Sequence, residues 1–137
     1  MKLNDAPSFD WPVRVYWEET DAGGVVYYAN YLKFLERART EWLSALGLEQ
    51  DRLALDAGVL FVVRRVEADY LRPARFNDRL LVRSRLSELG HASLVMQQEV
   101  LRDSERLLSA RVQVASVEPV SFRPARIPRF VTEKIRP

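Results

Sequence analysis

The chain has 137 residues, of which 47% are hydrophobic and 29% are charged, a composition typical of one globular domain rather than of a disordered chain. It contains no cysteine and one histidine, which excludes disulfides, thiol nucleophiles and cysteine-ligated zinc. The sequence pI is about 9.1, but the excess of positive charge lies in residues 123–137, so the charge pattern does not favour nucleic-acid binding.

Nothing in the sequence directs the chain to a membrane. No segment approaches the ~20 consecutive apolar residues of a transmembrane helix. The N-terminal residues also lack the apolar core of a secretion signal. We therefore expect a cytoplasmic protein with a single domain over residues 1–137, an N-terminal arm over 1–10 and a basic, proline-containing tail over 119–137.

The first expected elements are a strand and a long helix. Trp11–Trp17 is rich in β-branched and aromatic residues, which favour a strand. After a polar break, Asn30 is placed to cap a helix that Gly47 ends. The apolar face of this helix follows the 3.6-residue period and consists of Tyr31, Phe34, Leu35, Ala38, Trp42, Ala45 and Leu46.

The rest of the chain changes to a two-residue period. Residues 49–57 form a short helix or turn, and Val59–Tyr70 is the first of four strands that we expect to meander. The later strands are indicated by alternation from residues 80, 94 and 108, and the tail is expected to be mostly irregular. One helix followed by a run of strands predicts an α+β fold, with an antiparallel sheet of about five strands packed on the long helix.

The segment with the most chemical potential is Thr20–Tyr31. Asp21 precedes the pair Gly23 and Gly24, and an aromatic-rich helix start follows. This order places a carboxylate near the positive end of a helix dipole and near free backbone N–H groups, which can bind an anion or polarise a carbonyl. An ordinary turn with an aspartate cap accounts for the spacing equally well. His91 falls in a turn between strands and is interpreted as a solvated side chain.

The residues WPVRVYWEETDAGGVVYYANYLKFLERARTEWL closely resemble the start of the hot-dog-fold acyl-CoA thioesterases. The nearest group is the small bacterial thioesterases associated with the Tol-Pal system, and the enzyme that hydrolyses 4-hydroxybenzoyl-CoA is also similar. The likeness continues through FVVRR and DYLRPAR and covers roughly residues 11–128. It implies a hot-dog fold, an acyl-CoA substrate, and a dimer or dimer of dimers with shared active sites. It implies neither a cofactor nor a metal ion.

By this resemblance, Asp21 is the catalytic carboxylate, acting as a general base or as a nucleophile. The backbone N–H of Tyr28 matches the donor that polarises the thioester carbonyl. The nearest group usually has His at the position of Tyr28 and often Tyr at that of Trp17. The Tyr28 backbone N–H is present whatever its side chain, so this difference affects only a side-chain role. The remaining candidates contact the acyl group or the phosphates of coenzyme A; they are Trp17, Gly24, Tyr27, Tyr31, Phe61, Val62, Arg64, Arg65, Ser93 and the basic tail.

Two other functions are compatible with a hot-dog fold. The substitutions at Tyr28 and Trp17 leave room for a binding module that holds acyl-CoA or an acyl carrier protein with weak or no turnover. A dehydratase is disfavoured, because such enzymes generally rely on a histidine and His91 lies outside the motif. A thioesterase needs fewer catalytic side chains than a dehydratase. Its leaving group is a thiol with a pKa of about 8.5, which leaves without a strong general acid.

Overall fold

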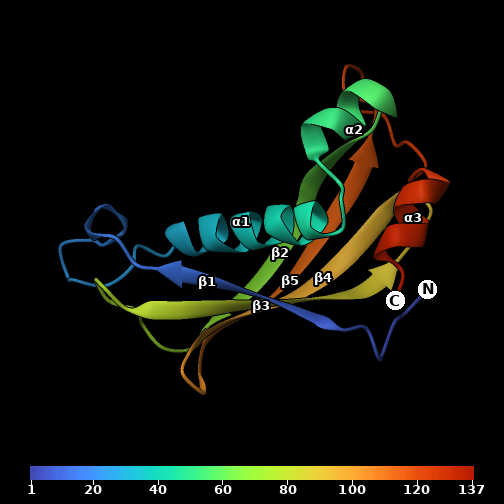
Figure 1. Cartoon of the computed structure of the whole chain (residues 1–137). Coiled ribbons are helices and arrows are strands. Elements are labelled where there is room, and N and C mark those ends of the chain that lie inside the picture. Colours follow the sequence, from blue (N-terminus) through green and yellow to red (C-terminus); the bar gives the residue numbers. More distant parts are fainter.

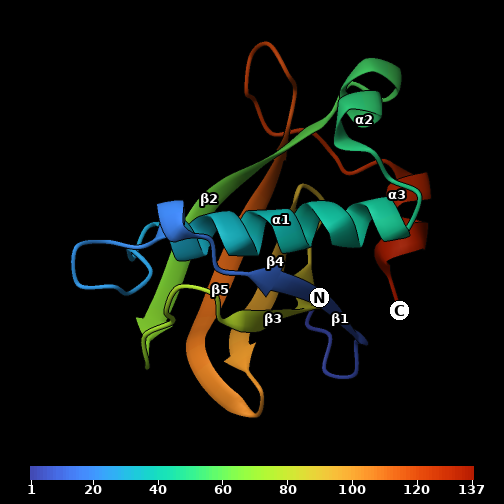
Figure 2. The ribbon, with the colours of Figure 1, turned by 60° about the vertical axis from the view of Figure 1, so that its left-hand side comes forward.

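The computed structural model describes residues 1–137, and it confirms an α+β fold with one five-stranded antiparallel sheet in the order β1-β3-β4-β5-β2. The strands are β1 (Ser8–Arg14), β2 (Leu60–Tyr70), β3 (Arg79–Leu89), β4 (Ser93–Arg102) and β5 (Glu105–Val117). The helices are α1 (Asn30–Ala45), α2 (Gln50–Asp56) and α3 (Arg129–Ile135). The curved sheet lies around α1, which crosses its concave face (Figures 1 and 2). This is the hot-dog arrangement.

The core forms between α1 and the concave face of the sheet. Alternate residues of β3, β4 and β5 point inward and are buried, as the two-residue period predicts. The helix contributes Tyr31, Phe34, Leu35, Ala38 and Leu43. Together with residues from the loops and α3, these side chains make a cluster of 26 buried residues. No helix in the molecule is both long enough and apolar enough to cross a membrane.

The start of the chain differs from the prediction. The first strand is Ser8–Arg14 rather than Trp11–Trp17, so it begins inside the expected arm. Trp17–Glu19 is instead a 3₁₀ turn, because the side chain of Glu19 folds back and accepts the Tyr16 N–H at 2.7 Å. That hydrogen bond ends the extended conformation before the residues of the candidate site.

The long helix differs from the prediction in its N-cap and in the buried residues of its last turns. Ala29, not Asn30, is the N-cap; Asn30 is helical, and its side chain donates to the carbonyl of Glu19 at 2.9 Å. Ala45 is exposed and Leu43 is buried, because the chain folds back with the Leu48 N–H donating to the Leu43 carbonyl. Gly47, at φ 79°, ends the helix as predicted.

The tail is mostly irregular, as predicted, but the prediction missed α3, which forms within it. Val131 and Ile135 are buried and spaced four residues apart, so they form the inner face of α3, and Ile127 just before the helix is buried in the same core. Pro128 immediately precedes this helix, where a proline does not interrupt it. The prolines in the tail favoured an irregular structure, so the sequence analysis did not detect this helix.

The strand order places β1 and β2 at the two edges of the sheet. The four later strands do not form a simple meander, because β2 pairs with β5 and β3 pairs with β1. β1 is short and contains Pro12, which cannot donate a hydrogen bond to a further strand. β2 is 11 residues long, contains no proline and has a register shift between Val63 and Arg65. The two edges therefore differ in their capacity to pair with another strand.

Candidate active site

Asp21 begins a tight hairpin that leads back to the start of α1. Thr20 and Val26 form a bridge, and the Asp21 N–H donates to the Val25 carbonyl at 2.9 Å. Gly24 completes the turn with φ 78°, a conformation that side chains rarely adopt. The Asp21 carboxylate accepts the Gly23 N–H at 2.8 Å and is exposed in the single chain. Its orientation is thus held by the backbone of its own turn.

Glu19 joins this turn to the start of α1 by hydrogen bonds. The sequence analysis did not predict this role. Its carbonyl accepts both the Tyr27 N–H at 3.0 Å and the side-chain amide of Asn30 at 2.9 Å. Its carboxylate is buried, accepts the Tyr16 N–H and lies 3.6 Å from the guanidinium of Arg37. The available signal was the three-residue spacing from Tyr16 to Glu19, which is that of a capping box.

The start of α1 provides a backbone donor beside this turn. The cap residue Ala29 has an αR conformation and makes no side-chain cap. The N–H of Tyr28 donates to no other group in the chain, while its carbonyl accepts the Tyr70 hydroxyl at 3.0 Å. A carboxylate and a free N–H are therefore carried by one compact segment at the positive end of a helix dipole.

Aromatic side chains surround the helix start. The rings of Tyr27 and Tyr28 lie 4.7 Å apart, and the Tyr70 ring lies 5.5 Å from Tyr31. The Tyr31 hydroxyl accepts the Ala74 N–H at 2.9 Å, and burial raises the pKa of both Tyr31 and Tyr70 above the usual value for tyrosine. Tyr70 comes from β2 and was not among the predicted residues. Its contacts join the end of β2 to the helix start.

Two aromatic residues of the candidate site are strongly exposed, one an expected acyl contact and the other the predicted backbone donor. Trp17 is 72% exposed and packs edge-on against Phe76, with the ring centroids 5.3 Å apart. The Tyr28 side chain is 62% exposed. A single copy of the chain thus presents uncovered aromatic side chains in the segment that carries Asp21.

Phe61 and Val62 lie at the end of β2 opposite to Tyr70, and Arg64 and Arg65 lie midway along the strand. Phe61 faces α1, whereas Val62 faces the outer side of the sheet, because neighbouring residues of a strand point to opposite faces. Ser93 and Val62 flank Ala115 in the sheet register. The two arginines, Arg64 and Arg65, occupy the register shift, and Arg65 pairs with Glu67 at 3.0 Å. One chain therefore does not bring these residues together with Asp21.

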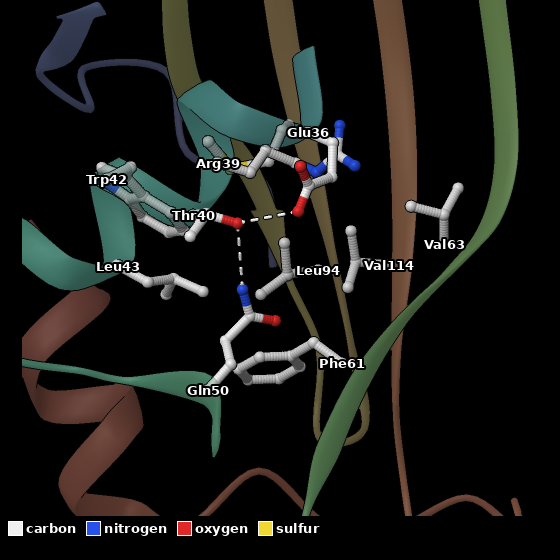
Figure 3. A pocket seen from close by; sticks show the side chains of 11 residues that line it. Glu36, Arg39, Thr40, Trp42, Leu43, Gln50, Phe61, Val63, Leu94 and Val114 are labelled. Atoms are coloured by element: carbon white, nitrogen blue, oxygen red, sulfur yellow. Dashed lines mark hydrogen bonds between the residues drawn. The ribbon is translucent and has the colours of Figure 1, made fainter. Parts of the chain in front are cut away.

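A cavity of about 110 Å³ lies beneath α1 at that same end of β2 (Figure 3). Of the predicted residues, only Phe61 lines it. The lining as a whole combines α1 with α2 and three strands and comprises Glu36, Arg39, Thr40, Trp42, Leu43, Gln50, Phe61, Val63, Leu94, Met96 and Val114. A larger polar cleft of about 680 Å³ lies beside α3 and is lined by cationic residues of the tail, including Arg126, Arg129 and Arg136, and by His91.

Comparison with known proteins places the chain in a family. A model of the thioesterase superfamily matches residues 23–109, which span α1, α2 and β2 to β4. The acyl-CoA thioesterase YbgC of Haemophilus influenzae is 42% identical over 123 residues, covering 90% of each protein. A probable thioesterase from Bartonella henselae has 36% identity and a TM-score of 0.84, covering 89% of this chain and 100% of that chain.

A more distant likeness concerns the fold alone. A crystal structure of a 4-hydroxybenzoyl CoA thioesterase has a TM-score of 0.87 at 18% identity, covering 93% of this chain and 98% of that chain. The helix-wrapping sheet is thus shared well beyond the range of clear sequence similarity. The chain belongs to the thioesterase superfamily, and it is a hot-dog-fold enzyme that hydrolyses thioesters.

Proposed function

We propose that the protein hydrolyses acyl-CoA thioesters in a site shared between two copies of the chain, with Asp21 and the Tyr28 N–H as its reactive groups. The similar bacterial proteins are named as acyl-CoA thioesterases or acyl-CoA thioester hydrolases. The exposed carboxylate beside a free N–H donor supports a reaction at a carbonyl carbon. No cofactor or metal ion enters this proposal.

The observation that carries the shared site is the separation of the candidate residues along β2. Tyr28, in the segment that carries Asp21, contacts Tyr70 at one end of this strand, while Phe61 lies at the other end and Arg64 lies midway. If two β2 strands pair antiparallel over their whole length, the Phe61 end of one lies opposite the Tyr70 end of the other. A two-fold dimer therefore unites the two halves of the site.

The β2 edge is suited to this pairing. It is the longer edge strand and lacks the proline that β1 carries. Val63 and Val66 face the α1 side of the sheet but are 47% and 36% exposed, so apolar surface remains uncovered along the edge. A second copy would extend the sheet and cover this surface, with both α1 helices on the same face.

The chemistry follows from the two groups. Asp21 takes a proton from water, whose oxygen adds to the thioester carbon, or its carboxylate oxygen adds directly and water later cleaves the resulting anhydride. In either route the negative charge on the carbonyl oxygen is stabilised by the Tyr28 N–H and the helix dipole. The carbon–sulfur bond then breaks, and coenzyme A leaves as a thiolate, which is protonated in solvent.

The phosphates of coenzyme A require cationic partners at the mouth of this site. We assign this role to Arg64 and Arg65 of the second copy, which lie midway along β2, and to Ser93 and the cationic tail, which lie towards the Phe61 end of the sheet. Trp17, Tyr27, Tyr31 and Gly24 border the reacting end, and Phe61 and Val62 border the second copy's side.

Substitution of Asp21 tests the proposal. We expect Asp21→Asn to lower the rate of thiol release from acyl-CoA by about 10²–10⁴-fold, because the base or nucleophile is lost while the fold is kept. Asp51→Asn, at an exposed aspartate on α2, is the matched control. Near-normal turnover by Asp21→Asn would contradict the assignment. Wild-type protein that binds acyl-CoA without releasing thiol would instead identify a binding module.

A further inference from the structure

A buried polar network extends from the core to the cavity beneath α1. Gln98 is fully buried, and its amide donates to the Leu35 carbonyl at 3.0 Å and to the Ser84 hydroxyl at 2.9 Å. Its remaining oxygen accepts a hydrogen bond from Arg39 at 3.0 Å. The bonds to Leu35 and Ser84 thus hold the Gln98 side chain in place, and Gln98 in turn fixes the position of the Arg39 guanidinium.

Arg39 has more donors than this network uses. A guanidinium carries five N–H donors, and only the bond to Gln98 is made within the chain. No carboxylate lies within ion-pair distance of it, and burial lowers its pKa from the usual value for arginine. Arg39 nevertheless lines the cavity. A rigidly held cation with unused donors therefore borders a small, partly enclosed space.

The other polar groups of the cavity are engaged with one another. The Thr40 hydroxyl donates to Glu36 at 2.9 Å and accepts the Gln50 amide at 3.3 Å, along one wall (Figure 3). The facing wall is apolar and consists of Phe61, Val63, Leu94, Met96 and Val114. An occupant therefore meets mostly carbon on one side and unpaired N–H donors at Arg39.

We propose that this cavity binds the far end of the acyl group, and that Arg39 donates a hydrogen bond to an oxygen carried there. The inference rests on the proposed thioesterase function. An acyl end bearing a hydroxyl or carboxylate satisfies Arg39, whereas a plain hydrocarbon end displaces water and leaves these donors unpaired. The enzyme is accordingly selective for acyl groups with an oxygen at the distal end.

The proposed dimer places the cavity within reach of the reaction. Phe61 and Val63 border the cavity and lie at the end of β2 that faces the Tyr70 end of a second copy. The cavity of one copy therefore adjoins the Asp21 segment of its partner. Within one chain, about 14 Å of helix separates Asn30 from Arg39, at 1.5 Å per residue.

The test compares acyl-CoA thioesters with the same number of heavy atoms that end in methyl, hydroxyl or carboxylate. For the wild-type dimer we expect kcat/KM to be roughly 10–100-fold higher for an oxygen-ended substrate than for its methyl-ended match. In Arg39→Met the ratio should fall towards one or below, since the oxygen-ended substrate loses its donor and the methyl-ended one gains an apolar wall. Preference for either oxygen-ended substrate supports the proposal.

Controls separate selectivity from folding and from turnover. Arg52→Met, at an exposed arginine on α2, should keep the wild-type ratio. Arg39→Lys should give an intermediate ratio and serves if Arg39→Met does not fold, as checked by circular dichroism. A wild-type enzyme that favours the methyl end, or an Arg39→Met enzyme that keeps the oxygen preference, would overturn the inference.

A failure of the proposed function can be distinguished from a failure of the Arg39 assignment. If no thioester is hydrolysed, binding of the same three thioesters by calorimetry still reports the selectivity of the cavity. Oxygen-ended thioesters that bind more tightly to wild type, but not to Arg39→Met, support the Arg39 assignment without turnover. Equal binding of all three by the wild type would reject it.

Discussion

A single backbone hydrogen bond orients the carboxylate proposed to act in the reaction. The Asp21 oxygen accepts the Gly23 N–H at 2.8 Å, and a Cβ added at Gly23 would lie 3.2 Å from that same oxygen. Gly23 does not have a positive φ, whereas Gly24 does at 78°. The two glycines therefore serve different purposes, since one leaves space for the carboxylate and the other allows the turn.

This difference leads to a prediction about Gly23→Ala. The added methyl group displaces the Asp21 carboxylate, so we expect kcat for thioester hydrolysis to fall about tenfold or more, while Tm changes little. Gly24→Ala, the matched variant, should lower Tm as well, because alanine in the left-handed region costs about 1–2 kcal/mol. Thiol-release kinetics and thermal denaturation check both. A Gly23→Ala enzyme with normal kcat would show that the carboxylate position is unimportant.

At the scale of elements, the start of α1 is joined to β2 and to the loop after it by tyrosines. The Tyr70 hydroxyl bonds the carbonyl of Tyr28, and the Tyr31 hydroxyl accepts the Ala74 N–H. Burial raises the pKa of Tyr31 and Tyr70 above the usual 10.0. Between the unfolded and folded pKa values the folded state keeps protons that the unfolded state releases, so stability falls as the pH rises above about 10.

Tyr31→Phe tests this linkage. At pH 7 the variant leaves the Ala74 N–H without its acceptor, and we expect the free energy of unfolding to fall by about 1 kcal/mol. Above pH 10 the wild type loses stability faster than the variant, so the two curves should approach each other. Urea denaturation at pH 7, 9 and 10.5 measures this. Tyr16→Phe, at an exposed tyrosine, should follow the wild-type curve; parallel curves for Tyr31→Phe would contradict the assignment.

At the scale of the whole molecule, the residues of the candidate site are spread along β2. Tyr28, in the segment that carries Asp21, contacts Tyr70 at one end, Arg64 and Arg65 lie midway along the strand, and Phe61 lies at the other end. In the proposed two-fold dimer each copy contributes one part of each of two sites. Activity would then depend on both copies, which subunit mixing can detect.

We predict that two impaired variants restore activity when mixed. Asp21→Asn lacks the reactive carboxylate, and a double variant, Arg64→Ser with Arg65→Ser, lacks the cations for coenzyme A. A heterodimer regains one complete site, so an equal mixture unfolded and refolded together should reach about a quarter of wild-type activity. Refolding each variant alone is the control. No gain on mixing would show that each site is built within one chain.

Much of the fold was predictable because its signals are local. The apolar period of residues 31–43 and the alternation along β3 to β5 depend on neighbours a few residues apart. The errors fell where a distant or polar contact intervened. Glu19 turned the end of the first strand into a 3₁₀ turn, and packing on the core produced α3 in a tail that its prolines marked as irregular.

The sequence by itself determined the long helix, the strand-forming segments and the closeness of Asp21 to the helix start, because only eight residues lie between Asp21 and Asn30. Tertiary structure alone decided that β2 lies at an edge, that Tyr70 contacts Tyr28 across 42 positions, and that Arg39 borders a cavity. These features depend on which segments pack together, and the hydrophobic period shows only that a face is buried, not which partner buries it.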